Sequence, residues 1–436
     1  MRIVGLITEY NPFHKGHAYH ISRAKELTGA DTCVVVMSGN YVQRGTPAFI
    51  DKHTRTSVAL SHGADAVFEL PVPFSCSSAE YFATAAVTYL HKMGIVTHIC
   101  FGAENSDMDK LQNIAATLAD AKLDNSHLLN KYIKDNLKAG MSYATARSAA
   151  LEKYINISDD STINNDALDN IASLLDMPNN ILAIEYLKAL RLLHSDIIPV
   201  AIARTEATYH DSVSNNPLYS ASSVRAALTD STDKEKKALV LEKLYEFSDE
   251  YRTVLGKTAP IEENDLSNIT DERLLHLCLS DASCNTLTDY MGIDNDLQNR
   301  ISNSDILFNH TCFTDLVQKL KTKNIAYTSI SRALLAITLG ITKSDVEAYI
   351  DNGFSSYIRL LGFRKESSAL LNEIKKKGEL TIIGQLSEIN DKKDLAALDK
   401  KLLSHSIYCD ELYNMIVRNK YKCHFLNEYQ RKILIK

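Results

Sequence analysis

The sequence predicts an α/β fold, in which a Rossmann-like parallel sheet is followed by a mainly α-helical C-terminal region. In the first half of the chain, short apolar runs rich in Val, Ile and Phe alternate with helix-length segments, a pattern typical of parallel βαβ units. Beyond about residue 231 the strand signal fades, and amphipathic helical segments follow one another. We therefore expect two domains, residues 1–230 and residues 231–436.

Five apolar runs are the expected strands. They are "RIVGLIT" (2–8), "TCVVVM" (32–37), "ADAVFEL" (64–70), "THICFG" (97–102) and "IIPVAIA" (197–203). The segments between the first four runs are helix-like, and each ends on a glycine suited to a C-cap. A further helix is expected after "MPNN" (177–180), and the polar stretch "NISDDSTINND" (156–166) is expected to be a loop.

Composition indicates an ordinary globular protein. Of 436 residues, 45% are hydrophobic and 23% charged, and the net charge of −6 neither indicates nor excludes a nucleic-acid partner, because a local basic face binds phosphates. The eight cysteines lack the paired CxxC spacing of a zinc site, which predicts reduced thiols. Neither a signal peptide nor a membrane-spanning run is recognisable, so we expect a cytoplasmic protein with no membrane partner. The oligomeric state stays open.

The stretch "NPFHKGHAYH" (11–20) follows the first expected strand directly. Pro12 ends that strand, and on a helix beginning near residue 13 the rings of His14 and His17 share one face. Gly16 removes a side chain where a ligand must approach the backbone. Free N–H groups at a helix start bind phosphate. The stretch therefore predicts a phosphate site with three donors: His14, His17 and a backbone N–H near Gly16.

Two other interpretations of these histidines stay open. An isolated HxxH is more often a pair of surface or core histidines. His14, His17 and His20 are also possible metal ligands, but a structural site needs a fourth ligand, and the glutamate of an HExxH motif is missing. Their place after the first strand of an α/β domain favours the phosphate site.

The residues around this stretch carry a family resemblance. "GLITEYNPFHKGHAYH" resembles the first signature of the HIGH-type (HxGH) nucleotidyltransferase superfamily. Together with "VVMSGNYVQRGTPAFIDKHTR", "DAVFELP", "FGAEN", "MPNNILAIEYLKAL" and "YIRLLGF", it resembles the bacterial tRNA(Met) cytidine acetate ligase family over most of the chain. The resemblance implies a nucleotidyltransferase-like ATP-binding catalytic domain at 1–230 and a tRNA-binding helical domain at 231–436.

The resemblance also implies a reaction. Acetate and ATP, with Mg²⁺ accompanying the nucleotide, would form acetyl-adenylate. The acetyl group would then pass to N4 of the wobble cytidine of elongator tRNA(Met), giving N4-acetylcytidine, AMP and diphosphate. Such a reaction needs donors that stabilise charge on phosphoryl oxygens, and no protein nucleophile.

Carried over position by position, the resemblance assigns catalysis to His14 and His17. ATP would be bound by the run Ile7, Thr8, Glu9, Tyr10, Asn11, Pro12, Phe13, His14, Lys15, Gly16, His17 and His20, and by Gly102, Asn179 or Asn180, and Arg204. Which asparagine corresponds stays open. "SASSVR" (220–225) is a loosened form of a second superfamily signature, so Ser222, Ser223 and Arg225 are candidate phosphate contacts. No protein ligand to a metal is expected.

Other polar residues follow the expected strands. Gln43, Arg44 and Lys52 come after the second strand, where Arg44 could hold a phosphate or contact RNA, or be a solvated loop residue. Glu69 and Glu80 are candidates for the same edge, with a structural role equally open.

Basic residues of the second half are candidates for tRNA contact. Over residues 361–436, Lys and Arg exceed Asp and Glu by five. The candidates are "KKK" (375–377), "RNKYK" (418–422), Lys321, Lys323, Arg332, Arg359, Arg364 and Lys365. Charge runs on helices are usually solvated faces, so the collective prediction is stronger than any member.

Two other functions are weighed against the ligase. An adenylyltransferase acting on a phosphorylated small metabolite would use the same fold, but such a substrate needs no large helical half. An RNA-binding or assembly protein with a vestigial nucleotide fold would not need the intact "HKGH".

Overall fold

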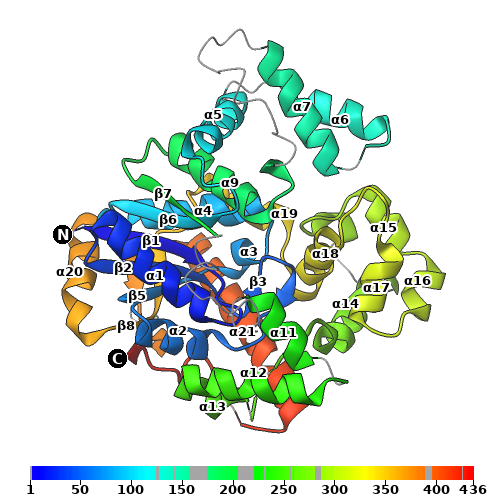
Figure 1. Ribbon diagram of the computed structural model, residues 1–436. Helices are drawn as coiled ribbons and strands as arrows, with labels where there is room; N and C mark the ends of the chain where they lie inside the picture. Colours follow the sequence, from blue (N-terminus) through cyan, green and yellow to red (C-terminus); the bar gives the residue numbers. More distant parts are fainter. Residues whose placement is uncertain are drawn as a thin grey trace.

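The computed structural model describes residues 2–123, 127–141, 143–157, 174–204, 220–229, 232–255, 257–258, 260–279, 286–387, 395–424 and 426–436. In these residues one large sheet carries helices on both faces, and further helices gather beside it (Figure 1). The expected α/β class is confirmed. Of the expected loop at 156–166, residues 156–157 end a helix and the rest lies outside the described residues.

The described part of the sheet has eight strands. They are β1 (Ile3–Thr8), β2 (Thr32–Ser38), β5 (Ala66–Leu70), β6 (His98–Ala103), β7 (Ile198–Ala203), β8 (Tyr357–Phe363), β9 (Thr381–Ile383) and β10 (Leu434–Ile435). The first five confirm the five strands expected from the apolar runs. A separate hairpin, β3 (Tyr41–Val42) with β4 (Thr46–Pro47), follows β2.

Strand order places β1 between β2 and β6. The order is β10-β8-β5-β2-β1-β6-β7, with β9 beside β8. Leu6 of β1 is in register with Val35 of β2 and with Cys100 of β6, and both pairings are parallel. The carboxyl ends of these three strands therefore meet at one edge, where open α/β sheets bind ligands.

Strand β8 contradicts the expectation that strands end with the first half of the chain. It pairs antiparallel with β5, in register at Phe68 and Leu360, and extends the sheet with β9 and β10. The sequence pattern gave no such strand because β8 is an isolated run between helices. The division near residue 230 stays a prediction, with the added fact that the second segment contributes strands to the sheet of the first.

Alternation along the strands produces two cores, one on each face of the sheet. Val34 and Val36 of β2 belong to one core, which includes helices α4 (Ala79–Lys92) and α9 (Pro178–Leu192). Val35 points to the other core with residues of helix α1 (Lys15–Thr28) and helix α2 (Lys52–Ser61). This period of two lets both faces of a fully buried strand be apolar.

The remaining helices of the first half pack around this frame. Helix α5 packs against α9, and α6 packs against α7. Their bounds are α3 (Val72–Ser75), α5 (Met108–Leu123), α6 (His127–Lys138), α7 (Tyr143–Ile157) and α11 (Ala221–Thr229). Helix α9 begins at Pro178, slightly earlier than expected, so Asn179 and Asn180 lie in its first turn.

The C-terminal half is mainly helical, as predicted. Its helices are α12 (Lys234–Phe247), α13 (Asp249–Leu255), α14 (Ser267–Leu279), α15 (Asn295–Ile301), α16 (Ser304–Asn309), α17 (Phe313–Leu320), α18 (Tyr327–Leu339), α19 (Lys343–Asp351), α20 (Ser368–Lys377) and α21 (Ala397–Tyr421), with short 3₁₀ turns η2 (Glu263–Leu266), η3 (Leu287–Asp289) and η4 (Lys365–Ser367). Figure 1 shows α14 to α18 grouped beside the sheet, and α21 running behind its centre.

Two expectations about the chain as a whole concern cysteines and membranes. The described cysteines are all free thiols, and Cys284 lies outside the described residues. Among the helices of the described ranges, none combines the length and apolar character needed to cross a membrane.

Candidate active site

The first turn of α1 is built by its own histidines. His14 is the N-cap, and its Nδ1 accepts a hydrogen bond from the Gly16 N–H (3.0 Å). In return, the His14 N–H donates to Nδ1 of His17 (3.2 Å). This reciprocal arrangement is that of a capping box, with imidazoles in place of Ser and Glu. The helix thus begins two residues later than expected, and the Gly16 N–H serves the cap instead of being a free donor.

These hydrogen bonds determine which nitrogen of each ring carries the hydrogen. A nitrogen that accepts a hydrogen bond carries no proton, so each neutral ring carries its hydrogen on Nε2. No described residue forms a hydrogen bond with Nε2 of His14 or His17. The ring centroids lie 3.8 Å apart. The pair therefore presents two neighbouring N–H donors that have no acceptor among the described residues.

Both imidazoles are held neutral. Burial, followed by the charges of Arg204 and Arg225, lowers the pKa of His14 to about 3. Burial and the neighbouring histidines and Arg204 hold the pKa of His17 well below its usual value. Burial also lowers the pKa of His20 to about 4. The Nε2 atom of His20 has no hydrogen-bond partner in the described part of the chain. The two arginines must lie near the rings to act on them.

The residues before α1 form the wall behind His17. The rings of Tyr10 and Phe13 are buried and lie 4.9 Å and 5.5 Å from the His17 ring. The Tyr251 hydroxyl, from α13, donates to the Phe13 carbonyl (2.7 Å). Tyr10 and Phe13 of the predicted ATP-binding run therefore orient the histidine, because a ring packed on two sides has few rotamers.

Arg55, on α2, braces the strand ends below the site. It is fully buried and donates to the carbonyls of Glu9 (2.5 Å), Ser38 (3.0 Å) and Gly39. Glu9 directly follows β1, Ser38 is the last residue of β2, and Gly39 directly follows it. Sequence analysis missed this residue, since nothing in "DKHTR" distinguishes a buried arginine from a solvated one.

A second group of predicted residues gathers at the ends of β6 and β7. The Arg204 side chain lies over Gly102, where an added Cβ would come within 3.4 Å of Arg204 Cγ. Arg204 Nη1 donates to Asn179 Oδ1 (3.3 Å). Glu104, at the end of β6, accepts from the backbone N–H groups of Asn179 (3.3 Å) and Asn180 (2.9 Å). Its carboxylate therefore caps α9 and positions Asn179.

The structure separates the two asparagines that the sequence left equivalent. Asn180 is fully buried, and its Oδ1 accepts from the Asn105 N–H (3.1 Å). Asn179 is partly exposed and contacts Arg204. Asn180 thus supports the fold, and Asn179 belongs to the cluster with Gly102 and Arg204.

Helix α11 brings the loosened second signature to the first one. Ser220 accepts from the Ser223 N–H (3.0 Å) and so begins the helix. Arg225 donates to the Asn11 carbonyl, between β1 and the histidines. Ser222 and Ser223 are exposed, and Ser220 Oγ bonds to both hydroxyls. Of the "SASSVR" residues, Arg225 contacts the predicted ATP-binding run directly.

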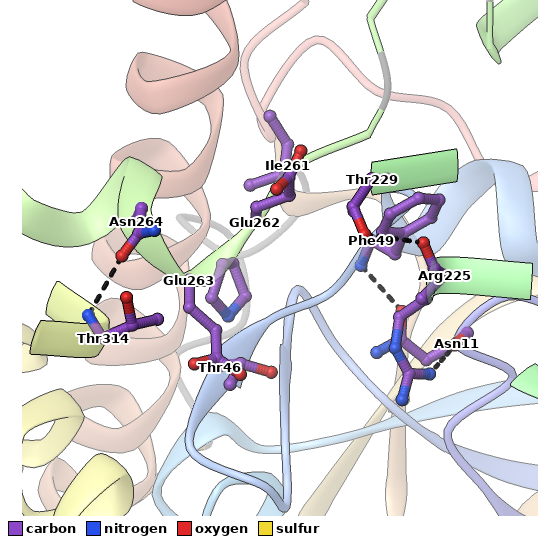
Figure 2. A pocket seen from close by; sticks show the side chains of 11 residues that line it. Asn11, Thr46, Phe49, Arg225, Thr229, Ile261, Glu262, Glu263, Asn264 and Thr314 are labelled. Carbon is purple, nitrogen blue, oxygen red and sulfur yellow. Dashed lines mark hydrogen bonds between the residues drawn. The ribbon is translucent and has the colours of Figure 1, made fainter. Parts of the chain in front are cut away.

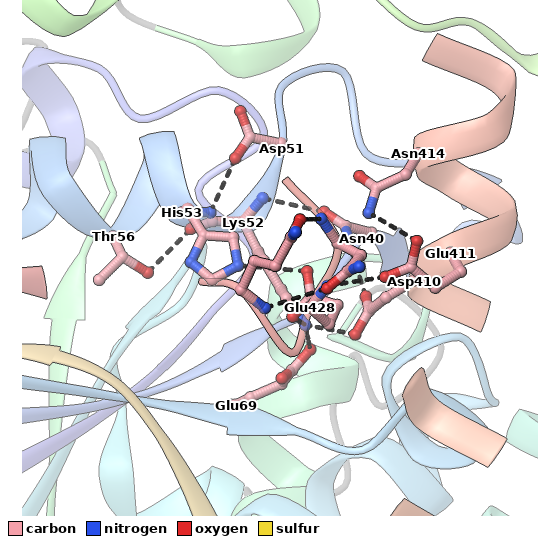
Figure 3. A network of polar contacts seen from close by, with 12 residues as sticks. Asn40, Asp51, Lys52, His53, Thr56, Glu69, Asp410, Glu411, Asn414 and Glu428 are labelled. Carbon is pink, nitrogen blue, oxygen red and sulfur yellow. Dashed lines mark hydrogen bonds and ion pairs between the residues drawn. The ribbon is translucent and has the colours of Figure 1, made fainter. Parts of the chain in front are cut away.

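Lys52 and Glu69 do not line this edge but belong to a buried ion cluster (Figure 3). Lys52 Nζ lies 2.7 Å from Glu69 Oε1 and 3.4 Å from Glu428 Oε2, and it also contacts Asp410 of α21. Arg359 of β8 pairs with the same three carboxylates. All five side chains are buried. The cluster joins segments far apart in the sequence and leaves no cation for a ligand.

The other basic and acidic candidates differ in their burial and in their ion pairs. Arg359 is wrong as a tRNA contact, because it is buried in the ion cluster. Lys420 pairs with Asp265 (2.7 Å), and Glu80 pairs with Lys122 (2.9 Å) and Lys188 (3.1 Å). The candidates that are exposed are Arg44, Lys321, Lys323, Lys365, Lys375, Lys376, Lys377, Arg418, Lys420 and Lys422.

The arrangement can stabilise negative charge without forming a covalent bond. Two neutral N–H donors lie beside Arg204 and Arg225 at the carboxyl end of β1. Fixed donors of this kind stabilise charge that develops on phosphoryl oxygens.

Known proteins place the chain in a family. It matches the HIGH Nucleotidyl Transferase family model over residues 1–428. The tRNA(Met) cytidine acetate ligase of Acetivibrio thermocellus is 33% identical over 432 residues, covering 96% of each chain. That of Clostridium novyi is 37% identical over 395 residues, covering 90% of this chain and 92% of its own.

A solved structure agrees over the whole chain. The crystal structure of Thermotoga maritima TmcAL bound with alpha-thio ATP superposes with a TM-score of 0.82 at 26% identity, covering 100% of this chain and 99% of the other. The chain therefore belongs to the tRNA(Met) cytidine acetate ligase family, within the HIGH nucleotidyl transferases.

Proposed function

We propose that this protein activates acetate with ATP as acetyl-adenylate and transfers the acetyl group to N4 of the wobble cytidine of elongator tRNA(Met). The products would be N4-acetylcytidine, AMP and diphosphate. The observation that carries this proposal is the pair of neutral imidazoles, each with Nδ1 in the helix cap and with no partner for Nε2–H among the described residues. Membership of the ligase family supports the choice of substrates.

In the first step, an acetate oxygen attacks the α-phosphorus and the bond to diphosphate breaks. Negative charge grows on the phosphoryl oxygens and on the departing diphosphate. His14 and His17 would donate their Nε2–H groups to these oxygens, and Arg204 and Arg225 would balance the charge. Because the rings are already neutral and fixed, they need no reorganisation as the charge develops.

The nucleotide would lie from the histidines toward β6 and β7. The run from Ile7 to His20 would surround its phosphates, with Tyr10 and Phe13 acting through the His17 ring. Gly102, Arg204 and Asn179 would contact the rest of the nucleotide. Of the two asparagines we propose Asn179, since Asn180 is committed to Asn105. Ser222 and Ser223 stay candidates for the outer phosphates.

In the second step, the cytidine N4 attacks the acetyl carbonyl carbon, AMP leaves with the electrons of the broken anhydride bond, and N4 releases one proton to solvent. The exposed lysines and arginines of the helical half would bind the tRNA backbone. Lys375, Lys376 and Lys377 form the densest group, at the end of α20.

Mg²⁺ would accompany the triphosphate in this proposal, and the reaction would take place in the cytoplasm. Among the described residues, no group of three or more His, Cys, Asp or Glu side chains is placed to hold a metal ion.

Acetate-dependent exchange of labelled diphosphate into ATP tests the first step. We expect exchange with acetate and none with phosphopantetheine or nicotinamide mononucleotide. Exchange only with a phosphorylated metabolite would favour the adenylyltransferase alternative. ATP binding that fails while tRNA binding persists would favour the non-enzymatic one.

Nucleoside mass spectrometry of cells that lack the protein tests the overall reaction. We expect loss of N4-acetylcytidine from elongator tRNA(Met). Unchanged N4-acetylcytidine would contradict the proposed acceptor.

A further inference from the structure

A cavity of about 310 Å³ adjoins the proposed ATP site, and the proposed reaction does not yet use it. Figure 2 shows Arg225 and Asn11 on one side of this cavity and Glu263 and Thr46 on the other. Asn11 connects the cavity to the histidines, because it lies three residues before His14 and its carbonyl accepts from Arg225. The cavity volume lies at the lower end of the range for small-molecule pockets.

The cavity lies on the acceptor side of the site. Gly102 of β6 and Arg204, which directly follows β7, are proposed for the nucleotide and lie on one side of β1. The cavity is built from the loop after β1 and from Thr46 and Pro47 of β4, which follows β2 on the other side of β1. A group held there would approach the histidines from the side opposite the nucleoside.

The lining combines apolar walls with a few polar groups. Phe49 and Ile261 are 2% and 1% exposed and form apolar surface. Glu263 offers a carboxylate, of which Oε2 accepts from the Tyr327 hydroxyl (2.6 Å). Arg225 offers further N–H groups, since a guanidinium has five donors and one is used at Asn11.

Arg225 and Glu263 act on each other across this space. Burial and the neighbouring Arg44 lower the pKa of Arg225, while Glu9 and Glu263 act in the opposite direction. Figure 2 places Glu263 and Arg225 on opposite sides of the cavity, so an acceptor and a donor are available to the groups at the two ends of a nucleobase edge.

We propose that this cavity is the subsite for the target cytosine base, an inference that rests on the proposed function. Glu263 accepts a hydrogen bond from the exocyclic amine, the pairing by which carboxylates read cytosine. Arg225 donates to an acceptor on the same edge of the base. Enzymes that modify a base hold it in such a pocket, away from its neighbours in the strand.

The carboxylate favours cytosine over the other candidate occupants. Uracil presents a carbonyl oxygen where cytosine has its amine, and this oxygen would face Glu263 without a hydrogen. Acetate alone would leave most of the volume unfilled and would place its own carboxylate against that of Glu263. Glu263 thereby becomes a residue that determines specificity for the acceptor.

Two variants of Glu263 test the proposal. Glu263→Ala and Glu263→Gln should each lower kcat/KM for tRNA acetylation by about 10- to 100-fold, with acetate-dependent diphosphate exchange unchanged. Glu263→Gln keeps a partner for Tyr327. Glu272→Ala, which removes an exposed carboxylate of α14, is the control and should change neither rate. Acetylation at the unsubstituted rate in both Glu263 variants, or equal loss of exchange, would overturn the subsite.

A measurement on the unsubstituted enzyme does not depend on how the variants fold. A tRNA(Met) with a photoreactive pyrimidine at the target position should crosslink to residues 46–49 or 261–264. Crosslinks only to other segments would overturn the proposal. If this enzyme instead shows no acetate-dependent exchange, it is the proposed function that fails, so the two failures are distinct.

Discussion

Two polar regions of this molecule differ in the partners that their groups have within the protein. In the ion cluster, Lys52 and Arg359 each lie within ion-pair distance of Glu69, Asp410 and Glu428. At the start of α1, two neutral imidazoles use one nitrogen each in the cap, and the other nitrogen has no hydrogen-bond partner among the described residues. Burial of polar groups therefore does not identify a functional site by itself.

The difference has a physical basis. A ring N–H that has no partner among the described residues remains available to donate a hydrogen bond to a ligand. A buried charge costs free energy and is tolerated only when it is paired. The ion cluster satisfies that rule by joining α2, β5, β8 and α21. Substitution of a residue in the ion cluster should destabilise the folded protein, and substitution of His14 or His17 should lower its activity.

The largest effect should follow Lys52→Met. Loss of this cation leaves three buried carboxylates with Arg359 alone, so we expect a loss of about 3–5 kcal/mol in the free energy of unfolding. Urea titration measures it. Lys122→Met, which breaks an exposed pair with Glu80, should cost less than about 1 kcal/mol. Equal losses of unfolding free energy in Lys52→Met and Lys122→Met would contradict the expected difference between a buried and an exposed cation.

His17→Ala should give the opposite result. Removing one fixed donor should slow acetyl-adenylate formation by about 10²- to 10³-fold. The lost cap contact should cost only about 1 kcal/mol of stability. Diphosphate exchange and thermal unfolding, measured together, separate the two effects. The exposed His424→Ala is the control. Exchange that survives in His17→Ala would remove the catalytic role from this residue.

The two asparagines should divide in the same way, with smaller effects. Asn179→Ala should raise KM for ATP about tenfold, the weight of a hydrogen bond to a charged group. Asn180→Ala should leave KM unchanged and lower stability by about 1–3 kcal/mol, because the Asn105 N–H loses its acceptor. The same change in KM and in stability for both variants would contradict the different roles assigned to Asn179 and Asn180 at the start of α9.

Acid should destabilise the histidine region by a smaller amount. His14 and His20 have folded pKa values of about 3 and about 4, below the usual 6.5, so their contribution is complete above pH 6.5. As the pH falls below 6.5 the unfolded chain binds protons that the folded chain refuses. Each residue should then cost about 1 kcal/mol at pH 5.5.

Urea titrations across this pH range check that expectation. His14→Gln with His20→Gln should reduce the dependence between pH 6.5 and 4, and His17, whose pKa is also lowered, should account for part of what remains. A dependence as steep in the double variant as in the unsubstituted protein would assign it to other groups.

The central part of the fold and site could be predicted from the sequence because both depend on local patterns. The run at residues 2–8 predicted β1, and "HKGH" with its position placed His14 and His17 at the start of α1, whereas the third expected donor, the Gly16 N–H, is used in the cap. The roles of Lys52 and Arg359 were not predictable, because their partners lie on other elements of the fold, from 17 to more than 300 positions away, and a buried cation has no local signature. Strand β8 was missed for a similar reason, since its neighbour β5 lies far back in the chain.

The Asn179 and Asn180 pair shows the limit within a single motif. Adjacent residues of the same type are equivalent in sequence, and only the direction of the helix separates them. Glu104, directly after β6, helps to set that direction because its carboxylate accepts hydrogen bonds from the first turn of α9.

The most direct test of the account is a crystal structure of this protein with a nonreactive ATP analogue. We predict that α-phosphate oxygens lie within hydrogen-bonding distance of Nε2 of His14 and His17, with both Nδ1 atoms still in the helix cap. A triphosphate bound elsewhere, with both Nε2 atoms bonded to protein groups, would contradict it.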